Sequence, residues 1–172
     1  LRDRERPPAD GRIYELRSPV AVLARAQAML RDATTLAVVD AFPPLVEVLR
    51  ADLVAAAARG VRVGLRVYEP TADLPGVRVF LAAHSDRVLA DWDGQVVTLA
   101  VDANSYLVAH MDHAMTGIRQ AFATSSTWLS LMASNGIAAE MIVGSLTRAS
   151  LTHPEALADA AQEAVEAWAY LD

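Results

Sequence analysis

The sequence contains no cysteine and no lysine. All fifteen basic side chains among its 172 residues are arginine. The absence of cysteine excludes disulfides, thiolate zinc sites, iron–sulfur clusters and a cysteine nucleophile. The absence of lysine excludes Schiff-base chemistry, a P-loop lysine and a lysine general base.

An excess of positive charge is also lacking. The formal net charge is −6 at pH 7 and the sequence pI is about 5.1, which argues against nucleic-acid binding by this chain alone.

Hydrophobic residues make up 53% of the sequence and charged residues 21%, so general disorder is excluded. A chain of this length buries roughly 70% of its unfolded surface on folding, and we expect one domain, or one domain with an appendage.

Residues 1–11 are charged and include Pro7-Pro8, so we expect no secretory signal in this segment. The stretch from Gln120 to Ala139 has no formal charge, but its polar residues favour a helix buried in protein over a membrane span. We therefore expect a cytoplasmic protein without membrane contact. The chain starts at leucine and not at methionine, which indicates a fragment. We interpret residues 1–10 as a linker remnant from a missing N-terminal part, residues 11–150 as the domain, and residues 151–172 as a C-terminal helix.

The first half of the chain has a clear α/β pattern. Ser18-Pro19 predicts the start of a helix. The apolar run within residues 35–42 predicts a buried strand, and Pro43-Pro44 then opens a helix that Gly60 ends. Residues 61–67 alternate as a second strand. Strand, helix and strand with tight connections form a βαβ unit, which predicts a parallel sheet and an α/β fold.

The second half is predicted to hold three short strands and then helices. The strands are placed at residues 77–82, 87–92 and 95–101, with Asp93-Gly94 as the hairpin turn between the last two. Helices are predicted from Asn104 to about Ala133, from Ile137 to Leu146, and after a capping box formed by Thr152 and Glu155. The apolar stripe of the final helix is Leu157, Ala161, Ala164, Trp168 and Leu171.

The segment from His84 to Asp91 carries a pattern with chemical meaning. Phospholipase D-type phosphodiesterases use His-x-Lys, four residues and then Asp on a strand, with the histidine as nucleophile and the lysine as phosphate ligand. His84 and Asp91 fit this spacing, but Asp86 stands where lysine belongs, and only Asn104 echoes the downstream Gly-Ser-x-Asn. Within ~4–5 Å a carboxylate in place of an ammonium disfavours a bound phosphate by several kcal/mol. The segment therefore resembles a phospholipase D scaffold without the phospholipase D reaction.

The order of elements from Gly11 to Leu131 resembles the C-terminal effector-binding domain of TrmB-family transcriptional regulators, a catalytically dead phospholipase D-like domain. The best-matched piece is Ala56-Ala57-Ala58-Arg59-Gly60-Val61-Arg62-Val63. The resemblance implies a phospholipase D-like mixed sheet flanked by helices, with extra C-terminal helices. It also implies a small-molecule effector, such as a sugar, and DNA binding only through a winged helix–turn–helix in the missing N-terminal part.

Ligand-binding residues are expected where the predicted parallel strands end, because open α/β sheets bind ligands at that edge. Asp40, Tyr68 and Glu69 lie there, although loop solvation and helix capping are alternatives and are favoured for Glu69. His110 and His113 are spaced i, i+3 on a predicted helix, but without an obvious third ligand we predict no metal site. The full set of predicted ligand-binding residues is Asp40, Tyr68, Glu69, His84, Asp86, Asn104 and His110.

The leading interpretation is a non-enzymatic, ligand-responsive regulatory domain in which the ligand shifts the arrangement of a dimer. It predicts no catalytic residue and no cofactor. The alternatives are a phosphodiesterase or other hydrolase that uses His84, and an interaction module without sensing. We expect a homodimer that forms through the final helix, because the other predicted helices already cover the sheet. Trp168 would be the large side chain of that interface.

Overall fold

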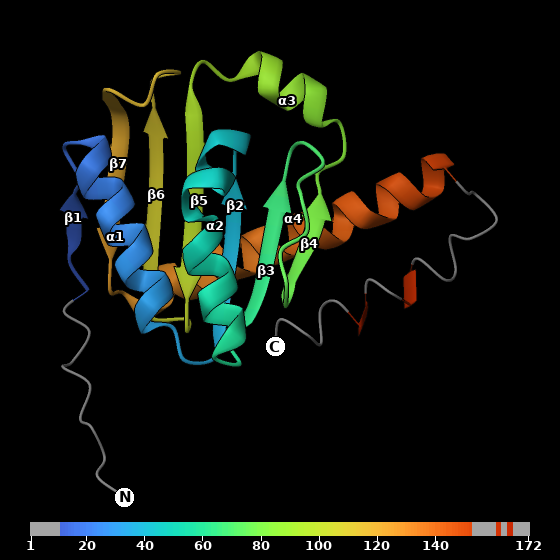
Figure 1. The fold of residues 1–172 in the computed structure, drawn as a ribbon, viewed down its shortest axis with the longest axis horizontal. Coiled ribbons are helices and arrows are strands. Elements are labelled where there is room, and N and C mark those ends of the chain that lie inside the picture. Colours follow the sequence, from blue (N-terminus) through green and yellow to red (C-terminus); the bar gives the residue numbers. More distant parts are fainter. Residues whose placement is uncertain (1–10, 153–160, 163–164, 167–172) are drawn as a thin grey trace, which may run out of the picture.

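The computed structural model describes residues 11–152, 161–162 and 165–166, which form an α/β fold (Figure 1). The strands are β1 (Ile13–Glu15), β2 (Leu36–Ala41), β3 (Arg62–Val67), β4 (Val77–Leu81), β5 (Gln95–Val101), β6 (Ser105–Met111) and β7 (Ile118–Thr124). The helices are α1 (Pro19–Asp32), α2 (Pro43–Ala58), α3 (Ser85–Asp91) and α4 (Thr127–Thr152). All seven strands form one mixed sheet in the order β1-β7-β6-β5-β2-β3-β4.

The predicted βαβ unit is confirmed. Strands β2 and β3 pair in parallel, with Val38 opposite Gly64, and α2 connects them. Strand β4 extends this parallel group, whereas β5, β6, β7 and β1 pair antiparallel. The predicted start of α1 is also confirmed, because the Ser18 hydroxyl accepts a hydrogen bond from the backbone N–H of Ala21 at 3.2 Å.

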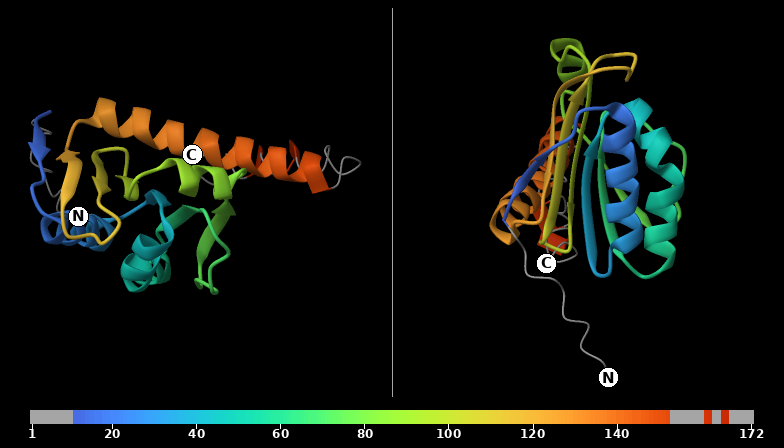
Figure 2. Two further views of the ribbon diagram at one scale, coloured as in Figure 1. Left: turned by 90° about the horizontal axis from the view of Figure 1, so that it is seen from above. Right: turned by 90° about the vertical axis from the view of Figure 1, so that its left-hand side faces the viewer.

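Helices cover both faces of the sheet (Figure 2). Helices α1 and α2 pack on one face and enclose the main hydrophobic core, in which Leu30, Leu49 and Leu65 are fully buried. Helix α4 crosses the other face over a smaller apolar cluster that includes Val38, Phe80 and Met141, and its C-terminal end extends past β4. Because side chains alternate along a strand, one set faces α1 and α2 while the other faces α4.

The predicted strand at residues 87–92 is wrong. Residues 85–91 form α3, and its half-buried Val88 and Leu89 pack on Phe42, Tyr68 and Ala82 beyond the end of the sheet. The predicted hairpin at Asp93-Gly94 is wrong for the same reason, because β5 pairs with β2 and β6 and not with residues 87–92. Two adjacent apolar residues can face one cluster from a helix turn, whereas in a strand they would face opposite sides.

The predicted helix from Asn104 to Ala133 is also wrong. Strands β6 and β7 lie in that range, and helix begins only at Thr127. The helix predicted at 137–146 is part of this one continuous helix, α4. Asp112 closes the β6–β7 turn, because its carboxylate accepts hydrogen bonds from the backbone N–H and the hydroxyl of Thr116 at 2.8 and 3.0 Å. The uncharged stretch from Gln120 to Ala139 is therefore part strand and part helix.

Within the described residues, one helical stretch, Thr127–Arg148 of α4, is long and apolar enough to cross a membrane by length and composition. A helix packed on a protein core passes the same test. Residues 1–10 and most of the predicted final helix lie outside the described residues, so the linker and the stripe from Leu157 to Leu171 stay predictions.

Candidate functional site

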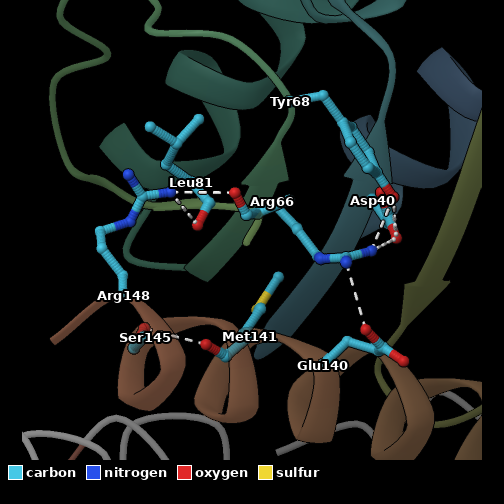
Figure 3. Close-up of polar contacts among 9 residues, drawn as sticks. Asp40, Arg66, Tyr68, Leu81, Glu140, Met141, Ser145 and Arg148 are labelled. Carbon is cyan, nitrogen blue, oxygen red and sulfur yellow. Dashed lines mark hydrogen bonds and ion pairs between the residues drawn. The ribbon is translucent and has the colours of Figure 1, made fainter. Parts of the chain in front are cut away.

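A cluster of polar side chains lies between the sheet and α4 near the carboxyl ends of β2 and β3 (Figure 3). Asp40 comes from β2, Arg66 from β3, Tyr68 from just beyond β3, and Glu140 from α4. Asp40 has the same strand parity as Val38, whose side chain packs against α4. The sequence analysis places Asp40 and Tyr68 at the carboxyl ends of the parallel strands, and the structure has them there.

Arg66 is the centre of this cluster. Its NH1 donates to the Oδ2 atom of Asp40 at 2.7 Å and to the hydroxyl oxygen of Tyr68 at 2.6 Å. Its NH2 donates to the Oε2 atom of Glu140 at 3.1 Å, and the Tyr68 hydroxyl donates to Asp40 Oδ2 at 3.2 Å. One guanidinium thus joins β2, β3 and α4.

Burial controls the protonation of the cluster. It raises the pKa of Asp40 above the ordinary value, although Arg66 opposes the shift. Burial and the neighbouring Asp40 charge raise the pKa of Tyr68, so its phenol stays neutral at physiological pH. The Nε atom of Arg66 is buried and has no hydrogen-bond partner among the described residues, so this polar cluster is not fully satisfied.

A second polar contact holds α4 to the end of β4. The NH2 group of Arg148 donates to the backbone carbonyls of Leu81 and Ala82, both at 2.9 Å (Figure 3). Glu140 and Arg148 are eight residues apart on α4, which is about two turns of helix. The helix is therefore fixed to the sheet by two polar contacts in addition to its small apolar cluster.

A pocket of about 270 Å³ lies at the carboxyl end of β3, beside the start of α2. Its lining residues are Pro43, Pro44, Val46, Glu47, Val67, Tyr68, Glu69, Pro70 and Thr71. Arg50 shapes one wall, because its NH2 donates to Glu47 at 2.6 Å and to the Thr71 hydroxyl at 2.8 Å. Pairing with Arg50 lowers the pKa of Glu47, so the Glu47 carboxylate is charged at neutral pH.

The start of α2 cannot bind an anion in the usual way. Helix N-termini bind phosphate through free backbone N–H groups, but the first two residues of α2 are prolines, which have none. The next two N–H groups, of Leu45 and Val46, donate to the carbonyl of Phe42 at 2.9 and 3.1 Å. With Glu47 and Glu69 also in the lining, the pocket favours an uncharged or cationic ligand.

Tyr68 connects the pocket with the polar cluster. It lines the pocket, its ring packs edge-on against Phe42 at a centroid distance of 4.7 Å, and its hydroxyl contacts Asp40 and Arg66. A ligand that displaces Tyr68 would therefore act on the residues that hold α4.

The seven predicted ligand-binding residues do not form a single site. Asp40 and Tyr68 share the polar cluster, and Glu69 lines the adjoining pocket. His110 lies on β6, where its Nε2 is 2.9 Å from the backbone carbonyl of Asp93. His84, Asp86 and Asn104 lie elsewhere: the first two are exposed at the start of α3, and Asn104 lies in the β5–β6 turn at the opposite end of the sheet.

The positions of the histidines bear on catalysis and on metal binding. His84 precedes helix α3 with a positive φ of 54°, and Asp91 is the last residue of that helix. Neither residue lies on a strand. In the described strands the single histidine is His110, and Asp112 and Gly117 follow it by two and seven residues. Among the described residues no group of three or more metal-binding side chains comes together. The predicted helix carrying His110 and His113 is wrong, because His110 is in a strand and His113 in a turn.

Sequence reasoning missed Arg66 and Glu140. Both have a recognisable signal: Arg66 is a charged residue near the end of β3, two residues before Tyr68, and Glu140 is the single charged residue between Gln120 and Thr147. A lone charge in an apolar segment needs a partner when it is buried. The contact between the two could not be read from the sequence, because it depends on where α4 crosses the sheet.

The mixed sheet between α1 and α2 on one face and α4 on the other defines a phospholipase D-like α/β domain. The chain belongs to the TrmB transcriptional regulator family: residues 12–125 match the N-terminal subdomain of its effector-binding domain (EBD). No curated protein sequence matches the chain. The phospholipase D-like fold and the family resemblance predicted from the sequence are thereby confirmed.

Three solved structures show the same fold. Nuc, a phospholipase D family member from Salmonella typhimurium, has a TM-score of 0.55 and 14% identity over 75% of this chain and 93% of that chain. NucT from Helicobacter pylori has a TM-score of 0.55 and 12% identity, covering 77% and 96%. TrmBL2, an archaeal chromatin protein, has a TM-score of 0.54 and 13% identity over 74% of this chain. This chain matches 52% of the TrmBL2 chain, about half its length.

Proposed function

We propose that this chain is the ligand-sensing part of a TrmB-like transcription factor and that it does not hydrolyse phosphodiesters. Family membership supports a regulatory role. The observation that carries the sensing proposal is the double contact of Tyr68, which lines the pocket and also hydrogen-bonds to the Arg66 cluster. The observation against hydrolysis is that His110, the one histidine on a described strand, lacks the required basic and acidic residues after it.

The proposed mechanism is a shift between two positions of α4. A ligand in the pocket contacts Tyr68, and any movement of its hydroxyl changes the geometry at Arg66, which also binds Glu140 of α4. A ligand that binds one arrangement more tightly increases the population of that arrangement. In a dimeric cytoplasmic regulator, this shift would change the spacing of DNA-binding domains attached at the N-terminus.

The ligand class follows from the pocket. An uncharged polyol such as a sugar, or a small cation, suits a pocket with two carboxylates, a hydroxyl group and no free helix N–H. Phosphorylated compounds are disfavoured by the Glu69 carboxylate, whereas the charge of Glu47 is already balanced by Arg50. At about 270 Å³ the pocket is slightly smaller than the usual range for ligand sites, which favours ligands of monosaccharide size or less.

The binding proposal is tested by thermal unfolding of the full chain with a panel of free hexoses, small amines and hexose 6-phosphates. A free sugar or an amine is expected to raise the melting temperature, and its phosphorylated counterpart is expected to have no effect. Glu69→Ala should weaken the response, whereas Asp86→Ala, which removes an exposed carboxylate on α3, should not. A stronger response to the phosphates would contradict the pocket assignment.

The competing enzyme hypothesis is tested with a chromogenic phosphodiester. We expect the same rate with the wild-type chain, with His84→Ala and with buffer. Turnover that disappears in His84→Ala would favour a phosphodiesterase and overturn the regulatory proposal. With a net charge of −6, the chain alone should also leave duplex DNA unshifted at physiological salt.

A further inference from the structure

Helix α4 exposes apolar side chains along the face that points away from the sheet. Trp128, Met132 and Val143 are 70%, 55% and 59% exposed. We define the outer face of α4 as the solvent-exposed residues that follow one another at helical spacing. They are Trp128, Leu131, Met132, Asn135, Gly136, Ala139 and Val143. From Trp128 to Val143 the face is about 23 Å long at the standard helical rise.

This outer face has almost no charge. Between Gln120 and Thr147 the single charged residue is Glu140, and its carboxylate is bound to Arg66. Isolated exposed apolar residues are common on protein surfaces, but a continuous row indicates a contact surface. Such a face is expected to be covered in the working protein.

The outer face is complementary to itself. When two copies of α4 are placed antiparallel about a point between Asn135 and Gly136, residues whose numbers sum to 271 lie opposite each other. Trp128 then faces Val143, Met132 faces Ala139, and Asn135 faces Gly136, so in these three pairs a larger side chain is opposite a smaller one. The fourth pair is Leu131 with Glu140, whose carboxylate is bound to Arg66. A Cβ atom added at Gly136 would have no heavy atom within 4 Å, so the middle of the face has room for a close approach.

We propose that the outer face of α4 is the contact surface between two copies of this chain, packed antiparallel across a two-fold axis near Asn135 and Gly136. Closed two-fold interfaces require that residue i contacts residue j and j contacts i, and the pairing above meets this condition. The proposal rests on the proposed homodimer and locates its interface on α4, in addition to the final helix.

The size of the outer face sets the expected affinity of the dimer, and the charges on α4 indicate which kind of partner it binds. Seven residues from each copy are fewer than the roughly 20–30 of a standard interface, so we expect a dimer that dissociates in the micromolar range and can respond to a ligand. A lipid surface is a poorer partner, because membrane-surface helices carry Lys and Arg on their polar face. In α4 the single basic residue, Arg148, binds backbone carbonyls at the end of β4.

The cysteine-free chain permits a direct cross-linking test. Asn135→Cys places one thiol beside the proposed axis, so mild oxidation of the full-length variant should link two copies through a disulfide. The control is Ala24→Cys, which also places a thiol at a solvent-exposed position, on α1 in the opposite layer. It should stay largely uncross-linked, because disulfides need Cβ atoms roughly 4 Å apart.

Sedimentation of full-length variants at tens of micromolar provides the second test. Met132→Glu should raise the dissociation constant about a hundredfold, because it puts an unpaired charge into the contact, while circular dichroism stays unchanged. Val143→Glu should act the same way if Met132→Glu folds poorly. Val20→Glu changes a residue on α1 that is 77% exposed and should leave the dimer intact.

The outcomes separate this proposal from the one it rests on. A wild-type monomer without Asn135→Cys cross-links would overturn both the homodimer and the α4 interface. A wild-type dimer that Met132→Glu and Val143→Glu leave unchanged, again without cross-links, would overturn the α4 interface alone. Retention of the wild-type chain on phosphatidylglycerol vesicles, lost in Met132→Glu, would show a lipid surface as the partner instead of a second copy.

Discussion

Replacement of Arg66 by leucine tests the electrostatic balance between the sheet and α4. The side chains of Arg66 and Asp40 are 11% and 20% exposed, so their ion pair is largely buried. Removing one partner of a buried pair costs about 3–5 kcal/mol. The residual exposure and the more exposed Glu140 reduce the expected loss to about 2–3 kcal/mol at pH 7. For a chain of this size, that loss lowers the melting temperature by about 4–12 °C.

The loss should depend on pH in a defined direction. Burial already raises the pKa of Asp40 and Arg66 opposes the rise, so Arg66→Leu should raise this pKa further. An acid with a raised pKa binds more protons folded than unfolded between the two pKa values, and stability therefore falls as pH rises through that window. The loss of folding stability caused by Arg66→Leu should thus be small near pH 4 and should grow toward pH 7.

Thermal melts of the full chain between pH 4 and pH 8 measure this effect. Adding Asp40→Asn to Arg66→Leu should recover more than half of the lost stability at pH 7, because the unpaired charge is removed. Arg87→Leu is the matched control: its ion pair with Asp91 at 3.5 Å is exposed and should contribute nothing measurable. A deficit that does not change with pH, or that Asp40→Asn does not relieve, would refute the reasoning.

Two further substitutions test local structure. The Asp102 carboxylate accepts hydrogen bonds from the backbone N–H groups of Thr34, Thr35 and Leu36. Burial alone would raise the pKa of Asp102, but these hydrogen bonds hold the pKa below its ordinary value. Asp102→Asn should cost about 1–2 kcal/mol in urea unfolding at pH 7, and the difference should vanish as pH falls through the folded pKa. Gly94→Ala should cost more than about 3 kcal/mol, because its Cβ would lie 2.0 Å from the Met111 carbonyl oxygen. Gly60→Ala, with open space at a φ of +87°, should cost about 1–2 kcal/mol.

The βαβ unit could be read from the sequence because its signals are local. Pro43-Pro44 opens α2, Gly60 follows its end, and residues 61–67 alternate. The parallel pairing then places the ends of β2 and β3 at one edge, which is why Asp40 and Tyr68 could be predicted as neighbours. Their contact with Arg66 needed only the observation that Arg66 and Tyr68 share strand parity.

The later strands could not be read in the same way. Residues 105–111 form a short apolar run whose length fits a strand or part of a buried helix, and only pairing with β5 and β7 decides between them. Strand β7 is also held by β1, more than a hundred residues earlier in the chain. Residues 87–92 fold as a helix because Val88 and Leu89 reach a cluster made of Phe42, Tyr68 and Ala82. Such long-range contacts leave no local periodicity.

Helix α4 has two different contact faces, and this difference bears on how sensing and assembly could be coupled. Its inner face packs on a small apolar cluster and is also held by polar contacts with fixed directions, from Glu140 to Arg66 and from Arg148 to two carbonyls. Its outer face exposes mainly apolar side chains, such as Trp128, Met132 and Val143. Hydrogen bonds change sharply with small displacements, whereas apolar packing adapts to small shifts. A displacement of Tyr68 would therefore change the hydrogen bonds on the inner face of α4. The outer face would respond by moving together with the whole helix.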